Sequence, residues 1–382
     1  MIITVVCDVF GEENNGTVIA EMNLIRFLQK QGHIVRILCG DQSKKGKENF
    51  YVCPNLNLGK PLNNYVKKVG VSLTRPDKKI IRAALDGAEV VHLMIPLALS
   101  MKAVKIARKM NIPITAGFHM QAENLTSHIL FDRSWLVNHI VYKYIYRHMY
   151  RYCDAIHFPT EFIKGVFYNH IKKPMPAYVI SNGVHEYVSP RTVEKPLEYK
   201  DKYVILTTGR YSTEKRQDVL IRAVKYSKHK NDIQLILGGE GPKINYYKRL
   251  SKKLPNAPVF KFFSRNDIID VLNYADMYVH PAQFELEGIS CIEAITCGKL
   301  TVVSDSKLSA TQNFAVDEKC KFRKNNAKDL ARVIDYWIEH PKESKECAQK
   351  YLKSAGSFNQ EECMKKMEQM IFDVIEKKKA AK

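Results

Sequence analysis

The fold is decided by residues 2–39, which read IITVVCDVFGEENNGTVIAEMNLIRFLQKQGHIVRILC. The β-branched apolar run at 2–10 predicts a buried strand. Residues 17–31 predict a helix that ends at Gly32, and residues 33–40 predict the next strand. The apolar side chains of this helix recur on one stripe, formed by Val18, Met22, Ile25 and Leu28. Strand, loop, helix and strand in this order are typical of a doubly wound α/β unit.

The same alternation continues along the chain. In the first half the further strand-like runs are 88–94, 112–119, 154–160 and 177–184. A polar, proline-containing stretch at 185–200 follows and is interpreted as a linker. In the second half the strand-like runs are 202–210, 232–242, 258–263, 275–281 and 299–305. We therefore expect an α/β chain with two Rossmann-like domains around a central cleft, 1–190 and 191–357, followed by a long amphipathic helix within 358–382.

The composition is that of a folded globular chain. Of 382 residues, 45% are hydrophobic and 26% are charged, which excludes disordered, collagen-like and low-complexity classes. Nine cysteines without a C-x-x-C pair favour a reducing cytoplasm over a disulfide framework or a zinc site. No signal peptide is visible, and the longest apolar stretch, 90–101, is too short to span a bilayer. We expect a cytoplasmic protein that is soluble or peripheral to the membrane.

The chain carries a large positive charge that is unevenly spread. Sixty Lys and Arg against forty Asp and Glu leave a net charge of +20. This predicts an anionic partner, which could be nucleic acid, an acidic membrane surface or a phosphate-bearing substrate. Residues 60–173 hold eighteen basic against seven acidic side chains, whereas residues 1–59 are balanced. The excess is therefore densest in the second part of the N-terminal half.

Within that region, the stretch WLVNHIVYKYIYRHMYRYC at 135–153 brings aromatic and basic residues together at helical spacing. The aromatic residues are Trp135, Tyr142, Tyr146 and Tyr150, and the basic ones are Lys143, Arg147, His148 and Arg151. Such a helix could rest at an anionic membrane surface. It could equally be a solvated basic face whose tyrosines pack on a core, and the sequence leaves both interpretations open.

The most specific motif lies in QFELEGISCIEAITCGKLTVVSD, residues 283–305. A helix is expected to start at Gly288, directly after an apolar strand. The unpaired N–H groups of Gly288, Ile289 and Ser290, helped by the helix dipole, could then bind an anion. This arrangement is typical of a phosphate site.

Two carboxylates flank this helix start. Glu285 precedes the turn, and Glu293 lies more than one turn inside the helix. Both could accept hydrogen bonds from hydroxyl groups on either side of a diphosphate, which suits a nucleotide sugar. The alternative is that both are ordinary surface charges near a helix start.

A second cluster lies in GRYSTEKRQDVLIRA, residues 209–223. Arg210 ends a strand and Lys215 follows on the loop, so the two cations could clamp a diphosphate. Ordinary solvent-facing cations would give the same pattern. Gly16, at the end of the loop GEENNG, could bring backbone N–H groups close to a phosphate, although two glycines in a loop usually only make a turn.

His119 is a candidate because of its place in the sheet. It ends the buried run at 112–119, and the carboxyl ends of parallel strands face the ligand crevice in such folds. Gln121 and Glu123 share its loop. A single histidine is more often structural, so position alone makes it only a candidate.

Taken together, these motifs resemble the retaining glycosyltransferases of family 4, which have the GT-B architecture. The matching segments occur in order over nearly the whole chain: the Gly16 loop, SNGV at 181–184, GRYSTEKRQD at 209–218, GGEGP at 238–242 and the E-x7-E segment. The resemblance implies an acceptor-binding first domain, a nucleotide-sugar-binding second domain and a C-terminal helix that crosses back onto the first domain.

The resemblance also implies roles for individual residues. Glu285 would contact the 3-hydroxyl region of the donor sugar, and Glu293 would bind the ribose diol. Arg210 and Lys215 would hold the diphosphate as it leaves. From the first domain, Gly16 would cover the phosphates and His119 would meet the donor sugar.

The chain departs from the family pattern at three places. Glu287 stands where phenylalanine is common, His185 replaces a common aspartate, and residues 307–320 replace a Gly-Gly-x-x-Glu segment. These differences leave the sugar and the acceptor open. FHMQAEN at 118–124 together with LSATQNFAVDE at 308–318 resembles the branch that includes bacterial diacylglycerol glucosyltransferases.

The expected function is therefore transfer of glucose or galactose from a UDP-sugar to a membrane lipid such as diacylglycerol, at the inner face of the cell membrane. No metal is expected, because no D-x-D-type carboxylate pair is present. The first alternative is a glycan or polyprenyl-linked acceptor in capsule or cell-wall assembly. The second is a basic nucleic-acid-binding protein, which no helix-turn-helix, zinc-finger or RNP-type segment supports, so no nucleic-acid partner is expected.

Overall fold

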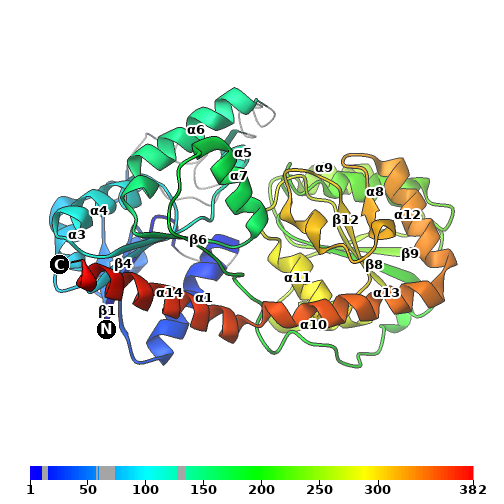
Figure 1. Ribbon diagram of the computed structural model, residues 1–382. Coiled ribbons are helices and arrows are strands. Elements are labelled where there is room, and N and C mark those ends of the chain that lie inside the picture. The colour runs from blue at the N-terminus through cyan, green and yellow to red at the C-terminus, as the bar shows by residue number, and fades with distance from the viewer. Residues whose placement is uncertain (11–15, 57–58, 60–73, 127–133, 382) are drawn as a thin grey trace. The chain divides into compact units, whose positions relative to one another are not determined.

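The computed structural model describes residues 1–10, 16–56, 59, 74–126 and 134–381. The chain divides into two compact α/β units (Figure 1). The first holds residues 1–182 together with 361–382, and the second holds residues 183–360. Within the described ranges, no helix combines the length and the apolar character needed to cross a membrane.

The first unit is built on a seven-stranded parallel sheet with the order β3-β2-β1-β4-β5-β6-β7. Its strands are β1 (Ile2–Cys7), β2 (Ile34–Cys39), β3 (Phe50–Val52), β4 (Val90–Leu93), β5 (Ile114–Gly117), β6 (Ala155–Phe158) and β7 (Ala177–Val179). The helices described in this unit are α1 (Gly16–Lys30), α3 (Lys78–Leu85), α4 (Ala98–Lys109), α5 (Ala122–Thr126), α6 (Trp135–His148), α7 (Glu161–Ile171) and α14 (Gln360–Ala380). The strand order changes direction between β1 and β4, which is the switch point of a doubly wound sheet.

The second unit is built on a six-stranded parallel sheet with the order β10-β9-β8-β11-β12-β13. Its strands are β8 (Tyr203–Thr208), β9 (Ile233–Gly238), β10 (Val259–Lys261), β11 (Met277–His280), β12 (Thr301–Ser304) and β13 (Lys321–Phe322). Its helices are α8 (Gln217–Tyr226), α9 (Ile244–Ser251), α10 (Arg265–Tyr274), α11 (Ile289–Thr296), α12 (Ala327–Glu339) and α13 (Pro341–Ser354). The switch point here lies between β8 and β11.

Local sequence explains where many of these elements begin. Side-chain caps that accept a backbone N–H start five of the described α-helices, at Asp77, Ser134, Thr160, Ser264 and Asn326. Such caps satisfy N–H groups that have no partner inside the helix. The strands are near-continuous apolar runs because helices cover both faces of a parallel sheet.

Helix α14 is held on the first unit by an apolar contact. Its side chains in that core are Cys363, Met364, Met367, Met370, Ile371 and Ile375. They share one cluster with Ile3 and Val5 of β1 and with Leu24 of α1. Beside this contact, His33 Nε2 and Glu368 Oε1 are 2.6 Å apart. Burial of apolar surface therefore fixes α14 to the first sheet.

The second unit begins at Gly183, eight residues before the boundary expected from the sequence. The backbone N–H of Val184 donates to the carbonyl of Phe358 over 2.7 Å. Val188, inside the stretch interpreted as a linker, is buried in the second core. Backbone pairing and burial therefore place residues 183–190 in the second unit.

The expected fold class is confirmed. Every run predicted to be a strand contains one, and the two units are Rossmann-like sheets covered by helices. The sequence reading missed β3 and β13, which are edge strands of three and two residues. Such short edge strands lack the apolar run that identifies a buried strand.

Candidate functional site

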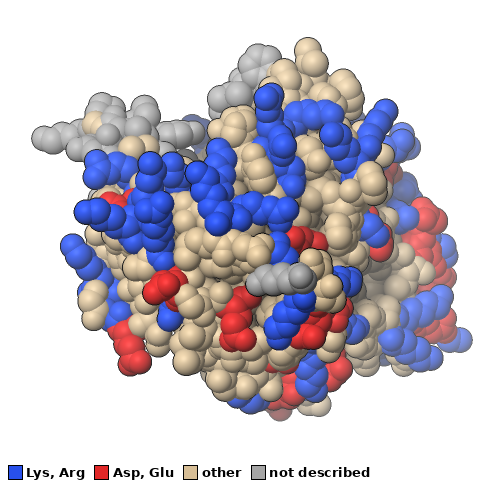
Figure 2. All heavy atoms as spheres, turned by 60° about the vertical axis from the view of Figure 1, so that its left-hand side comes forward, with Lys and Arg blue, Asp and Glu red and all other residues tan. Residues whose placement is uncertain are grey.

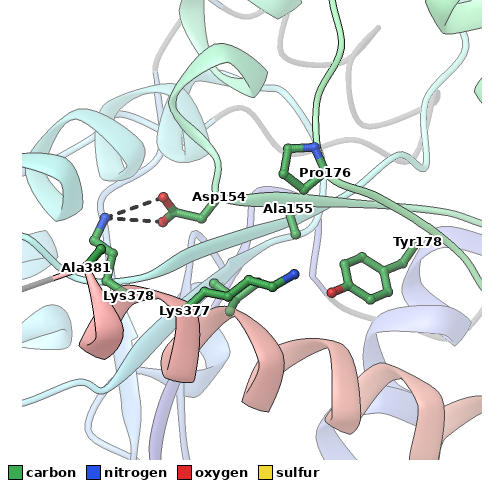
Figure 3. Close-up of a pocket in the computed structure, with 8 residues that line it drawn as sticks. Asp154, Ala155, Pro176, Tyr178, Lys377, Lys378 and Ala381 are labelled. Carbon is green, nitrogen blue, oxygen red and sulfur yellow. Dashed lines mark hydrogen bonds and ion pairs between the residues drawn. The ribbon is translucent and has the colours of Figure 1, made fainter.

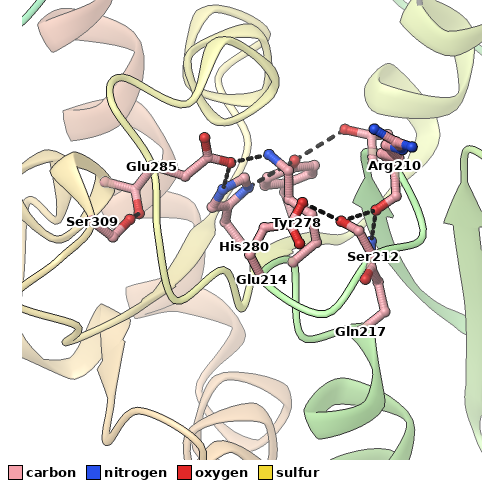
Figure 4. A network of polar contacts seen from close by, with 11 residues as sticks. Arg210, Ser212, Glu214, Gln217, Tyr278, His280, Glu285 and Ser309 are labelled. Atoms are coloured by element: carbon pink, nitrogen blue, oxygen red, sulfur yellow. Dashed lines mark hydrogen bonds and ion pairs between the residues drawn. The ribbon is translucent and has the colours of Figure 1, made fainter. Parts of the chain in front are cut away.

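The densest cluster of predicted site residues lies at the carboxyl ends of the strands of the second unit. Arg210 and Lys215 follow β8, and Glu285 follows β11, its neighbour in the sheet. Figure 4 shows Arg210 and Glu285 around Tyr278, with Ser309 beside Glu285. The fold therefore brings Arg210, Lys215 and Glu285 together at the carboxyl ends of two neighbouring strands, β8 and β11.

The loop after β8 is held against the loop after β9. The N–H of Gly209 donates to the carbonyl of Gly238 over 2.9 Å, and the N–H of Tyr211 donates to the carbonyl of Glu240 over 2.8 Å. A Cβ atom at Gly239 would lie 2.2 Å from the Gly209 carbonyl oxygen. A Cβ atom at Gly241 would lie 2.7 Å from the Tyr211 carbonyl oxygen, so close backbone contact requires glycine at both 239 and 241, and this explains the motif without a ligand.

Lys215 and Glu285 form an ion pair. The Nζ of Lys215 donates to Oε1 of Glu285, and their side chains are 23% and 12% exposed. Burial alone would raise the pKa of Glu285, but the charge of Lys215 and a hydrogen bond from His280 lower it to about 2. Glu285 is therefore a carboxylate at any physiological pH, and it can only accept hydrogen bonds.

The backbone around Lys215 is unusual. Arg216, the next residue, has φ 54°, in the left-handed region that few non-glycine residues adopt. Its side chain pairs with Asp218 at 3.0 Å and also bonds Asn325. Strain of this kind is often found at functional sites, and here it sets the turn that carries Lys215 into α8.

Arg210 is fixed through its backbone. Its carbonyl accepts from Nε2 of Gln217 over 3.0 Å, and Gln217 in turn accepts from the hydroxyl of Tyr247 over 3.0 Å. Gln217 and Tyr247 are buried. This buried pair therefore anchors the end of the loop that presents the Arg210 side chain.

Glu285 is linked to three further polar residues that the sequence analysis missed. Nε2 of His280 lies 3.0 Å from Oε1 of Glu285, and Nδ1 of His280 lies 3.3 Å from the Tyr278 hydroxyl. That hydroxyl is 3.0 Å from Oγ1 of Thr208. A signal was available, because His280 is a polar residue at the carboxyl end of an otherwise apolar strand.

The segment that departs from the family pattern braces the Glu285 loop. Glu285 forms a parallel bridge with Ser309, and its carbonyl accepts from the N–H of Ala310 over 2.9 Å. The hydroxyl of Ser306 donates to the carbonyl of Gln283 over 2.8 Å. The segment that departs from the family pattern therefore supports the backbone of the Glu285 loop at the strand end.

Gly288 starts α11 in the expected place. It has φ 88°, and a Cβ atom there would lie 2.4 Å from Cγ2 of Thr311. Only glycine fits such a position without strain. The first backbone N–H groups of α11, on Ile289 and Ser290, have no acceptor within the helix, and they lie beside Glu285 in the chain. Glu287, whose role the sequence left open, is buried.

Glu293 lies on α11 and pairs with a residue not singled out from the sequence. Its Oε1 is 2.9 Å from NH1 of Arg265, the first residue of α10. Burial raises the pKa of Glu293, and Arg265 opposes that rise. The side chain of Glu293 is 13% exposed, so it is not the simple surface charge that was the alternative interpretation.

His119 and Gly16 belong to the first unit. His119 follows β5, and its ring covers Gly117, where a Cβ atom would lie 2.4 Å from Nε2. Burial, together with His157 and His92, lowers the pKa of His119 well below its usual value, so the ring is uncharged at neutral pH. Gly16 is the exposed first residue of α1, and the rest of its predicted loop, 11–15, lies outside the described residues.

The neighbours of His119 have structural partners. The carboxylate of Glu123 accepts from the hydroxyl of Tyr142 over 2.9 Å, and both side chains are buried. Gln121 is buried as well. The hydrogen bond of Glu123 ties α5, which follows β5 closely, to α6.

A small pocket in the first unit lies at the opposite ends of the strands. It is lined by the starts of β6 and β7 and by the end of α14 (Figure 3). Lys378 pairs there with Asp154 at 3.4 Å, and the hydroxyl of Tyr178 donates to Asp373 over 3.1 Å. Its place at the amino ends of the strands separates it from the ligand side of the sheet.

Helix α6 shows how the aromatic and basic stretch is arranged. Tyr142 and Tyr150 are fully buried, as expected of tyrosines that pack on a core. Other apolar side chains are exposed, namely Trp135 (63%), Leu136 (62%), Ile140 (58%) and Tyr144 (53%). Core packing therefore accounts for Tyr142 and Tyr150, and the membrane contact stays a prediction.

Two family descriptions match the chain one after the other. "Glycosyltransferase Family 4" matches residues 15–186, and "Glycosyl transferases group 1" matches residues 188–353. Together they cover most of the chain.

Individual relatives are more distant. The alpha-monoglucosyldiacylglycerol synthase of Streptococcus pneumoniae is 22% identical over 55% of this chain and 50% of its own length. The sulfoquinovosyl transferase of Arabidopsis thaliana is 24% identical over 72% of this chain and 54% of its own length. The matches thus span about half the length of these curated relatives.

A solved structure shows the same fold over nearly the full length. The HepE protein of Anabaena, solved in complex with UDP, has a TM-score of 0.74 at 14% identity, over 97% of this chain and 99% of that one. The two successive family matches and this architecture agree with the order of motifs in the sequence. The chain belongs to the GT-B glycosyltransferases that join a family 4 domain to a group 1 domain.

Proposed function

We propose that the chain is a retaining glycosyltransferase that moves glucose or galactose from a UDP-sugar to a membrane lipid such as diacylglycerol. The observation that carries the proposal is the Lys215–Glu285 ion pair, which lies at a strand end next to the start of α11. It offers a cation for a diphosphate and a carboxylate for a sugar hydroxyl. The name of one relative, the alpha-monoglucosyldiacylglycerol synthase of Streptococcus pneumoniae, supports a lipid acceptor.

In this proposal catalysis is mainly stabilisation of the leaving group. Lys215, Arg210 and the first N–H groups of α11 neutralise the charge that grows on the departing UDP. The acceptor hydroxyl attacks the same face of the sugar, and the departing phosphate takes its proton. Neutral His119 can exchange a hydrogen bond with a sugar hydroxyl. Because cationic side chains supply the neutralising charge, we propose that no metal ion is required.

A donor and acceptor panel tests the proposal. UDP release should be measured with UDP-glucose, UDP-galactose and GDP-mannose, with vesicles that contain or lack diacylglycerol. We expect release from one of the two UDP-hexoses, accelerated by diacylglycerol, and an α-linked product by NMR. Acceleration only by a glycan or a polyprenyl phosphate would favour the alternative acceptor, and no release from any donor would refute the proposal.

The lipid acceptor implies that the first unit meets a membrane, and α6 is the element we propose for this contact. Its exposed apolar side chains lie on the same helix as exposed Lys143 and Arg147, and exposed Arg151 follows directly. Lys and Arg also gather on one face of the molecule (Figure 2). Apolar groups that insert at the headgroup level and cations that attract anionic lipids act together in peripheral binding.

Reversal of this charge should weaken vesicle binding. The variant with Lys143, Arg147 and Arg151 changed to Glu should bind vesicles containing phosphatidylglycerol at least roughly tenfold more weakly, since each basic group near an anionic surface contributes about 1 kcal/mol. Flotation or surface plasmon resonance measures the effect. The control changes Lys342, Lys345 and Lys350 of α13, which are also exposed, to Glu.

The control variant, with three lysines of α13 changed to Glu, alters the net charge by the same amount but on the second unit. If both triple variants lost vesicle affinity equally, the effect would be one of net charge. If the α6 variant bound vesicles like the wild type, α6 would not be part of the membrane contact. Phosphatidylcholine vesicles provide the uncharged reference surface.

A further inference from the structure

The Glu285 carboxylate is held asymmetrically. Its Oε1 accepts from both Lys215 Nζ and His280 Nε2, whereas among the described residues its Oε2 accepts from none. The side chain keeps 12% of its surface exposed. Figure 4 shows the second oxygen on the side away from these two donors. One oxygen is therefore used to fix the group, and the other stays available to a ligand.

The groups around His280 determine which of its two ring nitrogens carries a proton. Lys215 can only donate, and Glu285 can only accept because its pKa lies near 2. His280 must therefore carry a proton on Nε2. In the tautomer that carries its proton on Nε2, Nδ1 accepts, and the partner it has is the Tyr278 hydroxyl at 3.3 Å.

Tyr278 can supply that proton. It is fully buried, and burial raises the pKa of its phenol well above 10, so the hydroxyl remains protonated. Its oxygen can accept from the hydroxyl of Thr208, 3.0 Å away. Each hydrogen bond in the chain Thr208–Tyr278–His280–Glu285 then has one donor and one acceptor.

We propose that His280 is a positioning residue: it turns the Glu285 carboxylate so that Oε2 receives a hydroxyl of the donor sugar. The inference rests on the proposed function and names a residue that the family motifs did not point to. Tyr278 acts through His280 by holding it in the tautomer that donates from Nε2. Lys215 alone cannot do this, because a flexible ammonium group attracts either oxygen.

The test compares three variants with UDP-glucose and with UDP. His280→Leu removes the donor, and transfer or hydrolysis of UDP-glucose should fall roughly tenfold, the usual effect of one hydrogen bond to a charged group. The Kd for UDP should change less than about twofold, because UDP lacks the donor hexose that Glu285 is proposed to bind. His280→Gln places an amide N–H near the same position and should restore activity to within about threefold.

Tyr278→Phe keeps His280 but removes its hydroxyl partner. It should lower turnover by less than His280→Leu and leave the Kd for UDP unchanged. This variant, with His280→Gln, keeps the test informative if His280→Leu does not fold. Thermal unfolding of each variant should be recorded alongside the kinetics.

Several results would overturn the inference. Wild-type turnover in His280→Leu, no rescue by Gln, or parallel losses of UDP affinity and turnover would each show a merely structural role. If the wild-type protein neither binds UDP nor uses any UDP-sugar, the proposed function is wrong, and the inference about His280 is wrong as a consequence. The behaviour of the wild-type protein therefore separates the two failures.

Discussion

Replacing Lys215 by Ala should slow UDP-sugar turnover by roughly 100- to 1,000-fold, the range found when a group that stabilises transition-state charge is removed. Lys215 is the cation paired with Glu285 at the end of β8. Its loss removes a counter-charge for the leaving diphosphate. The pKa of Glu285 should also rise, because Lys215 is the main group that lowers it. Steady-state kinetics with UDP-glucose measure the change.

Two further variants make this result specific. Lys225→Ala removes an exposed lysine from α8 and should leave activity within about twofold of the wild type. Lys215→Arg keeps the charge but changes its shape, and it should recover only part of the lost rate. Activity near the wild-type level in Lys215→Ala would remove Lys215 from the phosphate site.

The arrangement of the strands was largely predictable from the sequence, because buried parallel strands are continuous apolar runs between polar loops. Residues 2–10 and 202–210 are runs of this kind, and each contains the first strand of one of the two sheets. The start of α11 at Gly288 was predictable for a related reason, since a positive φ at a helix start favours glycine. Signals of this kind are local, so one stretch of sequence is enough to see them.

The contacts within the site were not predictable, because they join elements that are distant in the chain. Lys215 and Glu285 were assigned to separate tasks, a phosphate and a sugar hydroxyl, yet the structure pairs them. Nothing near Glu293 in the sequence points to Arg265, which reaches it from α10. Pairs of this type depend on which strand ends become neighbours in the sheet.

Replacing Glu293 by Ala should weaken UDP binding by roughly 100-fold. The carboxylate is expected to accept both ribose hydroxyls, and each hydrogen bond to a charged group contributes about 1.5–3 kcal/mol, offset in part by solvent. Isothermal titration calorimetry with UDP alone tests this without any need for the acceptor. The matched comparison is Arg265→Ala, which removes the partner of Glu293 and leaves the carboxylate.

The pH dependence distinguishes a ligand-binding carboxylate from one half of a structural ion pair. Burial raises the pKa of Glu293 and Arg265 opposes the rise. UDP affinity should therefore fall as the pH drops through that raised pKa, because the protonated acid is a poorer acceptor. In Arg265→Ala the pKa of Glu293 rises further, so the loss should begin at a higher pH, while affinity at alkaline pH stays close to that of the wild type. If the two variants instead lose affinity equally at every pH, the ion pair supports the fold and Glu293 does not bind the ribose.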